Sequence, residues 1–202
     1  IKYQDTELNL SSFFKKIFIR KDPPFGDDYL NLTYLLDYAV KEGTDVINNP
    51  SSIRNHNEKL SILNFQEIIP PTIVTSTASE VVNFLKLHEK IVLKPINGMA
   101  GNGIFVIDEL DKNINSILET STVNDTKVMM AQKYIPDITE GDKRIIIIKG
   151  EPLPFCLARI PDGKDFRANL AKGGTGIAKK ITADDINIVN VIKKYLVKSK
   201  LD

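Results

Sequence analysis

Two short runs of apolar, mostly β-branched residues stand on either side of a glycine-bearing segment near the middle of the chain. The first run covers residues 91–93 and is followed by Lys94, and the second covers residues 104–107. Gly98, Gly101 and Gly103 lie between the two runs. Apolar runs separated by glycines are typical of strands joined by a turn, so the pattern predicts a strand, a loop and a second strand.

Apolar residues at helical spacing predict helices elsewhere, because positions three and four apart lie on one face of a helix. The helices are expected at residues 29–41, from the turn at 48–52 to about residue 65, and at 78–88, 113–120 and 183–198. Gly43 follows the first helix, Ser76 or Thr77 precedes the third, and Thr182 precedes the last, as helix ends require. The residues predicted to face inward are Leu32, Leu35, Leu36, Ala39, Ile53, Leu60, Leu63, Ile186, Val189, Ile192 and Leu196.

Further apolar runs predict strands that alternate with these helices. They are expected at residues 13–20, 46–47, 68–74 and 128–134, and as a β-hairpin at 145–148 and 153–160 that turns at Gly150. Strands interleaved with helices indicate an α/β fold. Arg20 and Lys21 follow the first strand, where this basic pair could face a substrate carboxylate or simply lie in a solvated turn.

The amino-acid composition is that of an ordinary globular protein. The chain has 202 residues, of which 42% are hydrophobic and 26% charged, enough for a sizeable core and for two subdomains. A net charge of +1 gives no electrostatic footprint for nucleic acid or an anionic membrane, so we expect neither as a partner. The single cysteine, Cys156, lies in an apolar run and is expected to be a buried structural thiol, which favours a reducing, cytoplasmic location.

The glycine-bearing loop after Lys94 has the chemistry of a phosphate site. Backbone N–H groups of a glycine-rich turn can point into one concavity, and a lysine adds the charge that attracts an anion. A dinucleotide fingerprint is excluded because a strand rather than a helix follows the loop, and a P-loop is excluded because Gly103 is followed by Ile104. In protein kinases the lysine follows the glycines instead of preceding them. A glycine-rich hairpin without any ligand remains the alternative.

A series of short motifs extends from about residue 17 to the C-terminus. In order they are Arg20-Lys21-Asp22-Pro23-Pro24-Phe25, Asn57-Glu58-Lys59-Leu60, the loop at 93–103, Met130-Ala131-Gln132, Gly141-Asp142-Lys143-Arg144, Cys156-Leu157-Ala158-Arg159-Ile160-Pro161, and Arg167-Ala168-Asn169-Leu170-Ala171 with Gly173-Gly174. Together they resemble the motifs of the ATP-grasp ligases, and within that superfamily they are most similar to those of the prokaryotic glutathione synthetases.

The resemblance implies an incomplete ATP-grasp fold of the α/β (α+β) class, preceded by the tail of an α/β substrate domain. Residues 1–47 would form that tail and residues 48–202 the ATP-grasp domain, with a lid subdomain at about residues 72–136. The chain opens with Ile1 rather than methionine. Set against the resemblance, most of an N-terminal domain and the last part of the ATP-grasp domain are expected to lie outside it.

The resemblance also implies which residues bind the nucleotide. Lys59 would contact its phosphates, and the backbone after residue 131 would pair with adenine. The full set is Lys59, Lys94, Gly98, Met99, Ala100, Gly101, Gly103, Gln132, Lys133, Tyr134, Ile135 and Asp142. Without the resemblance, Glu58 and Lys59 read as the solvated face of a helix, and residues 132–135 as an ordinary strand end.

Four residues are candidates for the catalytic role. Folding the hairpin about Gly150 brings Arg144 and Arg159 toward the same end, where two guanidinium groups could bind phosphate or carboxylate oxygens; either could instead be a surface charge. The polar, glycine-bearing connection at 162–179 is predicted to be a functional lid, and it carries the other two candidates, Arg167 and Asn169.

The implied enzyme is an ATP-dependent carboxylate–amine ligase that joins γ-glutamylcysteine and glycine into glutathione. ATP would phosphorylate the carboxylate, and the amine would attack the resulting acyl phosphate. Mg²⁺ is the implied metal; we expect none of its protein ligands within the chain and place them beyond Asp202, so the chain alone is expected to be inactive. The full-length enzyme could be a homo-oligomer.

Two other functions remain open at this stage. A related ATP-grasp ligase that adds amino acids to another peptide would keep the same nucleotide residues. A non-catalytic nucleotide-binding module would keep them as well, and would lack the carboxylates that bind magnesium.

Overall fold

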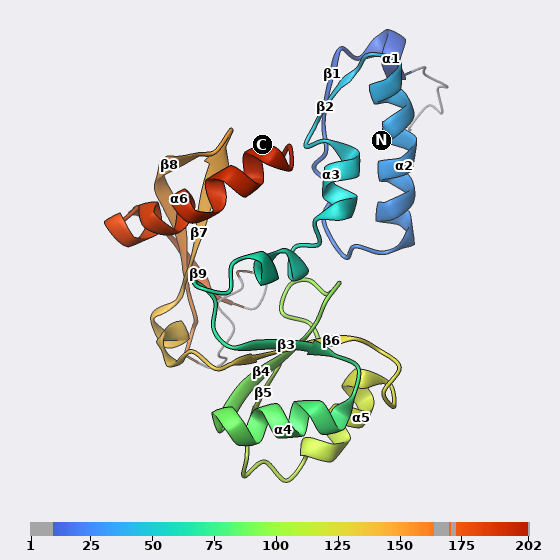
Figure 1. The fold of residues 1–202 in the computed structure, drawn as a ribbon. Helices are drawn as coiled ribbons and strands as arrows, with labels where there is room; N and C mark the ends of the chain where they lie inside the picture. Colours follow the sequence, from blue (N-terminus) through green and yellow to red (C-terminus); the bar gives the residue numbers. More distant parts are fainter. Residues whose placement is uncertain (1–9, 164–169, 171–172, 202) are drawn as a thin grey trace.

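The structure is a computed structural model that describes residues 10–163, 170 and 173–201. Its described strands form a two-stranded, a four-stranded and a three-stranded sheet, and each sheet has its own helices (Figure 1). The predicted α/β class is confirmed. Two of the four candidate catalytic residues, Arg167 and Asn169, lie outside the described residues, as do residues 164–169, 171 and 172 of the predicted lid.

The N-terminal region consists of α1 (Leu10–Phe13), β1 (Lys16–Phe18), α2 (Asp27–Lys41) and β2 (Asp45–Ile47). Strands β1 and β2 pair in parallel, with Ile17 opposite Val46. The apolar run at 13–20 was predicted to be strand throughout, but it begins as helix, and only three of its residues are in the strand. Helix α2 buries Thr33, Leu36 and Ala39, whereas Leu35 is 64% exposed, contrary to the prediction. Helix α3 (Pro50–Asn55) and strand β2 cover one stripe of α2, and positions 33, 36 and 39 form that stripe, whereas Leu35 lies outside it.

The helix predicted from residues 48–52 to 65 is two separate elements, α3 (Pro50–Asn55) and the 3₁₀ helix η1 (Leu60–Asn64). Asn49 starts α3 as predicted, since its side-chain oxygen accepts a hydrogen bond from the Ser52 N–H at 3.1 Å. Asn57 then starts a new turn, because its side-chain oxygen accepts from the N–H groups of Lys59 and Leu60 at 2.9 and 3.1 Å. Lys59 therefore lies in a connection rather than on a helix face.

The four-stranded sheet has the order β3-β6-β4-β5 and is antiparallel throughout. Its strands are β3 (Thr72–Thr75), β4 (Lys90–Pro95), β5 (Phe105–Asp108) and β6 (Met129–Lys133), so the predicted strand–loop–strand around the glycines is confirmed. Helices α4 (Ala78–His88) and α5 (Ile114–Thr122) pack on one face, as the lower part of Figure 1 shows. The core between them consists of Val81, Phe84, Leu85, Ile91, Leu93, Ile107, Leu118, Met129 and Ala131.

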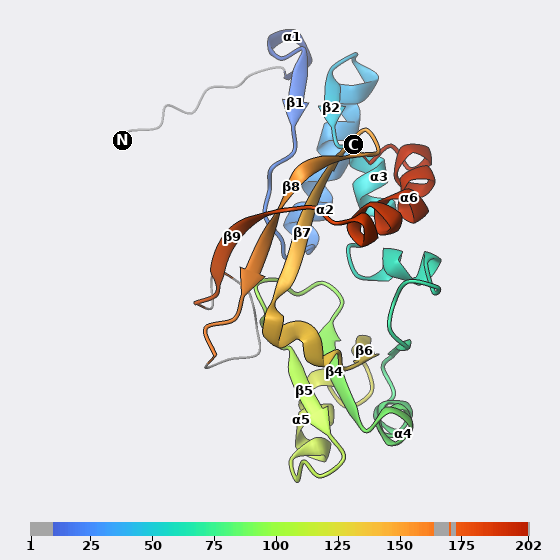
Figure 2. The same cartoon turned by 90° about the vertical axis from the view of Figure 1, so that its left-hand side faces the viewer.

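The three-stranded sheet follows the short 3₁₀ helix η2 (Pro136–Glu140) and has the order β7-β8-β9. Strands β7 (Asp142–Ile148) and β8 (Glu151–Ile160) form the predicted hairpin. Strand β9 (Thr175–Lys180) pairs with β8, so the end of the predicted lid is a strand and not a loop. Figure 2 shows the three strands running side by side, with α6 next to them.

Helix α6 (Ala183–Lys198) has the predicted bounds and the predicted cap. Thr182 and Asp185 form a capping box, in which each side chain accepts a hydrogen bond from the other residue's N–H. Val189 is buried as predicted, but Ile186 is 42% exposed because it lies at the side of the face that meets the sheet. The predicted burial of Cys156, on β8, is confirmed.

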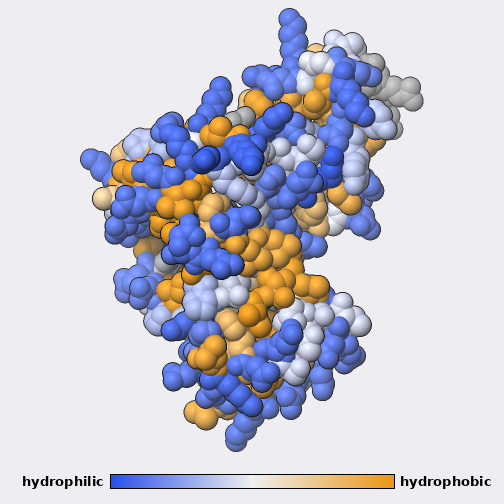
Figure 3. All heavy atoms as spheres, viewed as in Figure 1, coloured by the Kyte–Doolittle hydropathy of each residue, from blue (hydrophilic) through white to orange (hydrophobic). Residues whose placement is uncertain are grey.

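The molecular surface mixes polar and apolar groups. Figure 3 shows apolar side chains gathered at the narrow middle of the molecule, above the four-stranded sheet. In the described part of the chain, no helix is both long enough and apolar enough to cross a membrane. The glycine-bearing loop leaves the four-stranded sheet at the level of this apolar region.

Candidate nucleotide-binding site

Lys94 lies on the face of the four-stranded sheet that is turned away from α4 and α5. Its neighbour Leu93 belongs to the core beneath the helices, and successive side chains of a strand point to opposite faces. The Lys94 ammonium donates to the side-chain oxygen of Gln132 on β6. Gln132 in turn donates from Nε2 to the hydroxyl oxygen of Thr72 on β3, at 2.8 Å. Three strands thus supply one hydrogen-bonded chain.

This arrangement leaves a positive charge in a poorly solvated place. Burial lowers the pKa of Lys94, the nearby positive charge of Lys59 lowers it further, and the Glu58 carboxylate acts in the opposite direction. Gln132 is itself buried, with 7% of its surface exposed, and its amide is neutral. A lysine held by a neutral partner beside another lysine attracts anions strongly.

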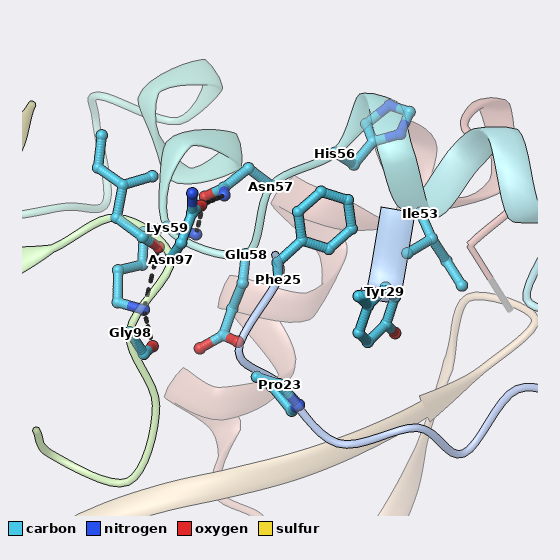
Figure 4. A pocket seen from close by; sticks show the side chains of 11 residues that line it. Pro23, Phe25, Tyr29, Ile53, His56, Asn57, Glu58, Lys59, Asn97 and Gly98 are labelled. Carbon is cyan, nitrogen blue, oxygen red and sulfur yellow. Dashed lines mark hydrogen bonds between the residues drawn. The ribbon is translucent and has the colours of Figure 1, made fainter. Parts of the chain in front are cut away.

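Lys59 contacts the glycine-bearing loop directly. Its ammonium donates to the backbone carbonyl oxygens of Gly98 at 2.8 Å and Ile96 at 3.3 Å. Figure 4 shows this side chain reaching the loop, and beside it the hydrogen bond between Asn57 and Asn97. The two lysines, which come from different motifs of the sequence, therefore meet at one loop.

The loop itself is compact, and Gly98 is the residue that permits this. A Cβ atom at Gly98 would lie 2.6 Å from Cγ of Pro95, closer than such atoms approach one another. The predicted loop residues Met99, Ala100 and Gly101 follow, and the backbone of Ala100 has a φ of +53°. A backbone packed this closely can present N–H groups to a ligand without interference from side chains.

A pocket of about 110 Å³ lies beside Lys59 and opens between the N-terminal region and the loop. Phe25 and Tyr29 form one wall, with ring centroids 5.0 Å apart, and burial together with the Asp22 charge raises the pKa of the Tyr29 hydroxyl. The complete lining is Pro23, Phe25, Tyr29, Ile53, His56, Asn57, Glu58, Lys59, Ile96, Asn97 and Gly98 (Figure 4). Arg20 and Lys21 are exposed and are not part of this lining.

The backbone at the end of β6, predicted to pair with adenine, is partly engaged. The Lys133 N–H donates to the Pro71 carbonyl at 2.9 Å, and the Tyr134 N–H donates to the Lys90 carbonyl at 3.0 Å. These two N–H groups hold the strand end in place. Of the four residues predicted to pair with adenine, Gln132 lies within β6, and its side chain accepts a hydrogen bond from Lys94.

Arg159 and Asp142 form a bidentate ion pair across the β7–β8 hairpin. Arg159 Nε donates to Asp142 Oδ1 at 2.7 Å, and its NH2 group donates to Oδ2. Asp142, predicted as a nucleotide ligand, is therefore bound to a predicted catalytic residue. Arg144 is exposed, and the register places it two residues from Asp142 and on the same face of the sheet. The expectation that the two arginines lie at the same end of the hairpin is confirmed.

Gly141 makes this pair possible. A Cβ atom there would lie 2.4 Å from the carbonyl oxygen of Arg159, and the residue has a φ of +101°. The chain can thus enter β7 directly against the backbone of β8. Gly103, the last glycine of the loop, is exposed just before β5.

Sequence reasoning missed three polar residues at this site: Thr72, Asn57 and Asn97. Asn57 belongs to a motif that was recognised, but its side chain was assigned no role. Thr72 follows two prolines at the start of a strand, a position that carries no chemical signal in the sequence. Within residues 10–163, 170 and 173–201, no three or more His, Cys, Asp or Glu residues form a group that could hold a metal ion.

Two family models match the chain. The one described as "Prokaryotic glutathione synthetase, ATP-grasp domain" matches residues 58–201, and the one described as "Prokaryotic glutathione synthetase, N-terminal domain" matches residues 2–54. The glutathione synthetase of Nitrosomonas europaea is 47% identical over 190 residues, which are 94% of this chain and 59% of that protein. The glutathione synthetase of Neisseria meningitidis serogroup B is 48% identical over 183 residues, which are 91% of this chain and 57% of that protein. The chain thus spans little more than half the length of these relatives.

Solved structures with the same fold are more distant in sequence. The D-cycloserine synthetase DcsG is 14% identical with a TM-score of 0.73, over 98% of this chain and 70% of that one. A Chryseobacterium gregarium ATP-grasp ligase, solved with ADP and peptides, is 18% identical with a TM-score of 0.61, over 91% of this chain and 62% of that one. These likenesses concern the fold alone.

Proposed function

The chain belongs to the prokaryotic glutathione synthetases, and from this premise we propose that it forms the nucleotide-binding part of an enzyme that joins γ-glutamylcysteine to glycine with ATP. The observation that carries the proposal is the meeting of Lys94 and Lys59 at the glycine-bearing loop. Both ammonium groups are held by neutral oxygens, which leave their positive charge uncompensated and available to a phosphate. This is the arrangement that a nucleotide polyphosphate requires.

The sheet face around Lys94 suits the rest of the nucleotide. Val92, Lys94, Met130 and Gln132 share this face by register; Val92 and Lys94 are half-buried, whereas Met130 is completely buried and lies beneath the surface that a ligand could reach. Apolar side chains next to a charged one can cover the base while the lysine contacts a phosphate. Because the N–H groups of Lys133 and Tyr134 are engaged within the fold, and the Ile135 carbonyl accepts from the Ile138 N–H at 3.3 Å, we assign pairing with adenine to the N–H of Ile135.

The chemistry would proceed in two steps. The carboxylate of γ-glutamylcysteine attacks the γ-phosphorus of ATP, which forms an acyl phosphate and releases ADP. The amine of glycine then attacks the acyl carbon, and the amide bond forms as inorganic phosphate leaves and the nitrogen loses a proton. Lys59 and Lys94 would hold the phosphates in line, and Arg144 with the Arg159–Asp142 pair would meet the carboxylate or the transferred group.

Magnesium, which the family implies, does not fit the described residues, because they contain no suitable cluster of carboxylates. Residues 1–47 would form the last part of the substrate domain, and residues 48–202 the ATP-grasp domain without its C-terminal part, with a lid subdomain at about 72–136. Arg167 and Asn169 would act as catalytic groups. The enzyme would be cytoplasmic, and the full-length protein could form a homo-oligomer.

The test is product formation by the full-length protein that contains this chain. ADP release should require both γ-glutamylcysteine and an amino acid, and should be fastest with glycine. Dependence on a different peptide or amine would identify another carboxylate–amine ligase. Nucleotide binding without any substrate-dependent turnover would identify a binding module.

A further inference from the structure

Asn57 links the segment that carries Lys59 to the glycine-bearing loop. Its Nδ2 donates to Oδ1 of Asn97 at 2.9 Å, across 40 residues of sequence. Its Oδ1 accepts from the N–H groups of Lys59 at 2.9 Å and Leu60 at 3.1 Å. We infer that Asn57 is a positioning residue that keeps the loop docked while Lys59 binds a phosphate, an inference that rests on the nucleotide site proposed above.

The orientation of the Asn57 amide is fixed by its surroundings. Two backbone N–H groups point at one end of the amide, so that end must be the oxygen. The nitrogen then faces Asn97 and must donate. One side chain thus starts η1 and holds the loop in the same conformation, so the loop position follows the position of Lys59.

The loop has a second anchor, but ligand binding would remove it. Lys59 donates to the carbonyl oxygens of Gly98 and Ile96. A phosphate that recruits the Lys59 ammonium competes with these carbonyls, because a charged acceptor makes the stronger hydrogen bond. The Asn57–Asn97 hydrogen bond does not involve a charge and would persist. It therefore becomes the contact that retains the loop when the site is filled.

The two functions of Asn57 can be separated by substitution in the full-length protein. Asn57→Ser keeps an oxygen that can start η1 but is too short to reach Asn97. Asn97→Ala removes only the hydrogen bond between Asn57 and the loop. Asn97→Asp keeps an oxygen that can accept this hydrogen bond from Asn57. Asn64→Ser, an identical change at an exposed position of η1, is the matched control.

Two measurements follow. Asn57→Ser and Asn97→Ala should each weaken ATP binding about three- to tenfold, with no added effect in the double variant, while KM for glycine stays unchanged. Hydrogen exchange of the ligand-free protein should be faster in both variants at Asn102, whose N–H donates to the Met99 carbonyl at 3.0 Å within the loop, and unchanged at 60–64. Asn97→Asp should restore slow exchange at Asn102, and Asn64→Ser should leave it unchanged.

The outcomes separate the two proposals. Additive effects of the two substitutions, or unchanged exchange at Asn102, would overturn the positioning role of Asn57 even if ATP binds. If the unaltered protein binds no ATP, the proposed function fails, whereas the exchange measurement still decides whether Asn57 holds the loop.

Discussion

Lys143 donates to both carboxylate oxygens of Asp185, at 3.0 and 2.8 Å, and so connects β7 to the first turn of α6. Asp185 is buried and also caps the helix. The hydrogen bonds from Lys143 are the main reason that the pKa of Asp185 lies below its ordinary value, while burial opposes the shift. The pair therefore joins the three-stranded sheet to its helix through a carboxylate that is ionised when folded.

The first prediction concerns acid stability. A carboxyl group with a lowered folded pKa stabilises the fold above its unfolded pKa of about 4, and this contribution is lost as the pH falls through the folded pKa. Lys143→Met should lower the free energy of unfolding at pH 7 by about 1 kcal/mol and by less at pH 3. Urea unfolding at both pH values measures this. Lys16→Met, which removes an exposed ion pair with Asp45, should change little at either pH.

The second prediction concerns protons taken up on nucleotide binding. Because the pKa of Lys94 is lowered, part of the ammonium loses its proton below pH 10.5. A bound phosphate favours the charged form and raises this pKa, so ATP binding in the alkaline range should consume protons. Calorimetry at about pH 9 in buffers of different ionisation enthalpy measures the uptake. Lys94→Met should abolish it and weaken binding by about 1.5–3 kcal/mol; an unaltered uptake would remove Lys94 from the site.

The third prediction concerns the tight backbone at Gly98. A methyl group there meets the Pro95 ring, so Gly98→Ala should displace the loop and weaken ATP binding by about 1–3 kcal/mol. Gly26→Ala is the control, because a Cβ atom at Gly26 has no neighbour within 4 Å and the residue's φ is −114°. Titration with ATP distinguishes the two variants; equal affinities would show that the loop tolerates a side chain at this point.

The fourth prediction separates a steric clash from backbone strain. Gly141 and Gly163 both have positive φ angles, of +101° and +81°, but only Gly141 lies against another backbone. Gly163→Ala should cost about 1–2 kcal/mol of stability, from conformation alone. Gly141→Ala should cost more than about 3 kcal/mol, because it also pushes β7 from β8. Unfolding in urea gives both values, and similar losses would contradict the clash.

The sequence predicted those helices and strands whose residues follow a regular apolar period or are bounded by turn residues. The strands around the glycines, the hairpin and α6 follow from apolar periodicity and turn residues, and their bounds are close to those expected. The break at Asn57 was not predictable from periodicity, because one side-chain hydrogen bond decides it. Strand β9 was missed because all six of its residues are exposed, so no alternation of apolar and polar residues marks it.

Several residues of the candidate site could be predicted from the sequence, but most of their contacts could not. Lys59 and Lys94 could be named from motifs, but the contact between Lys94 and Gln132 joins residues 38 positions apart on neighbouring strands. The hydrogen bond from Gln132 to Thr72 joins residues 60 positions apart. Such contacts depend on strand order, which the sequence alone did not provide. The ion pair between Asp142 and Arg159 likewise needed the register of the hairpin.

The neutral partners of Lys94 and Lys59 also have a kinetic consequence. Because amide and carbonyl oxygens do not cancel positive charge, and Glu58 offsets only part of it, the empty site should draw anions from a distance. Encounters with a polyanion should then be faster than with a neutral ligand of the same size, and should slow as ionic strength rises. The charge that the fold leaves unbalanced thereby governs how quickly the site fills.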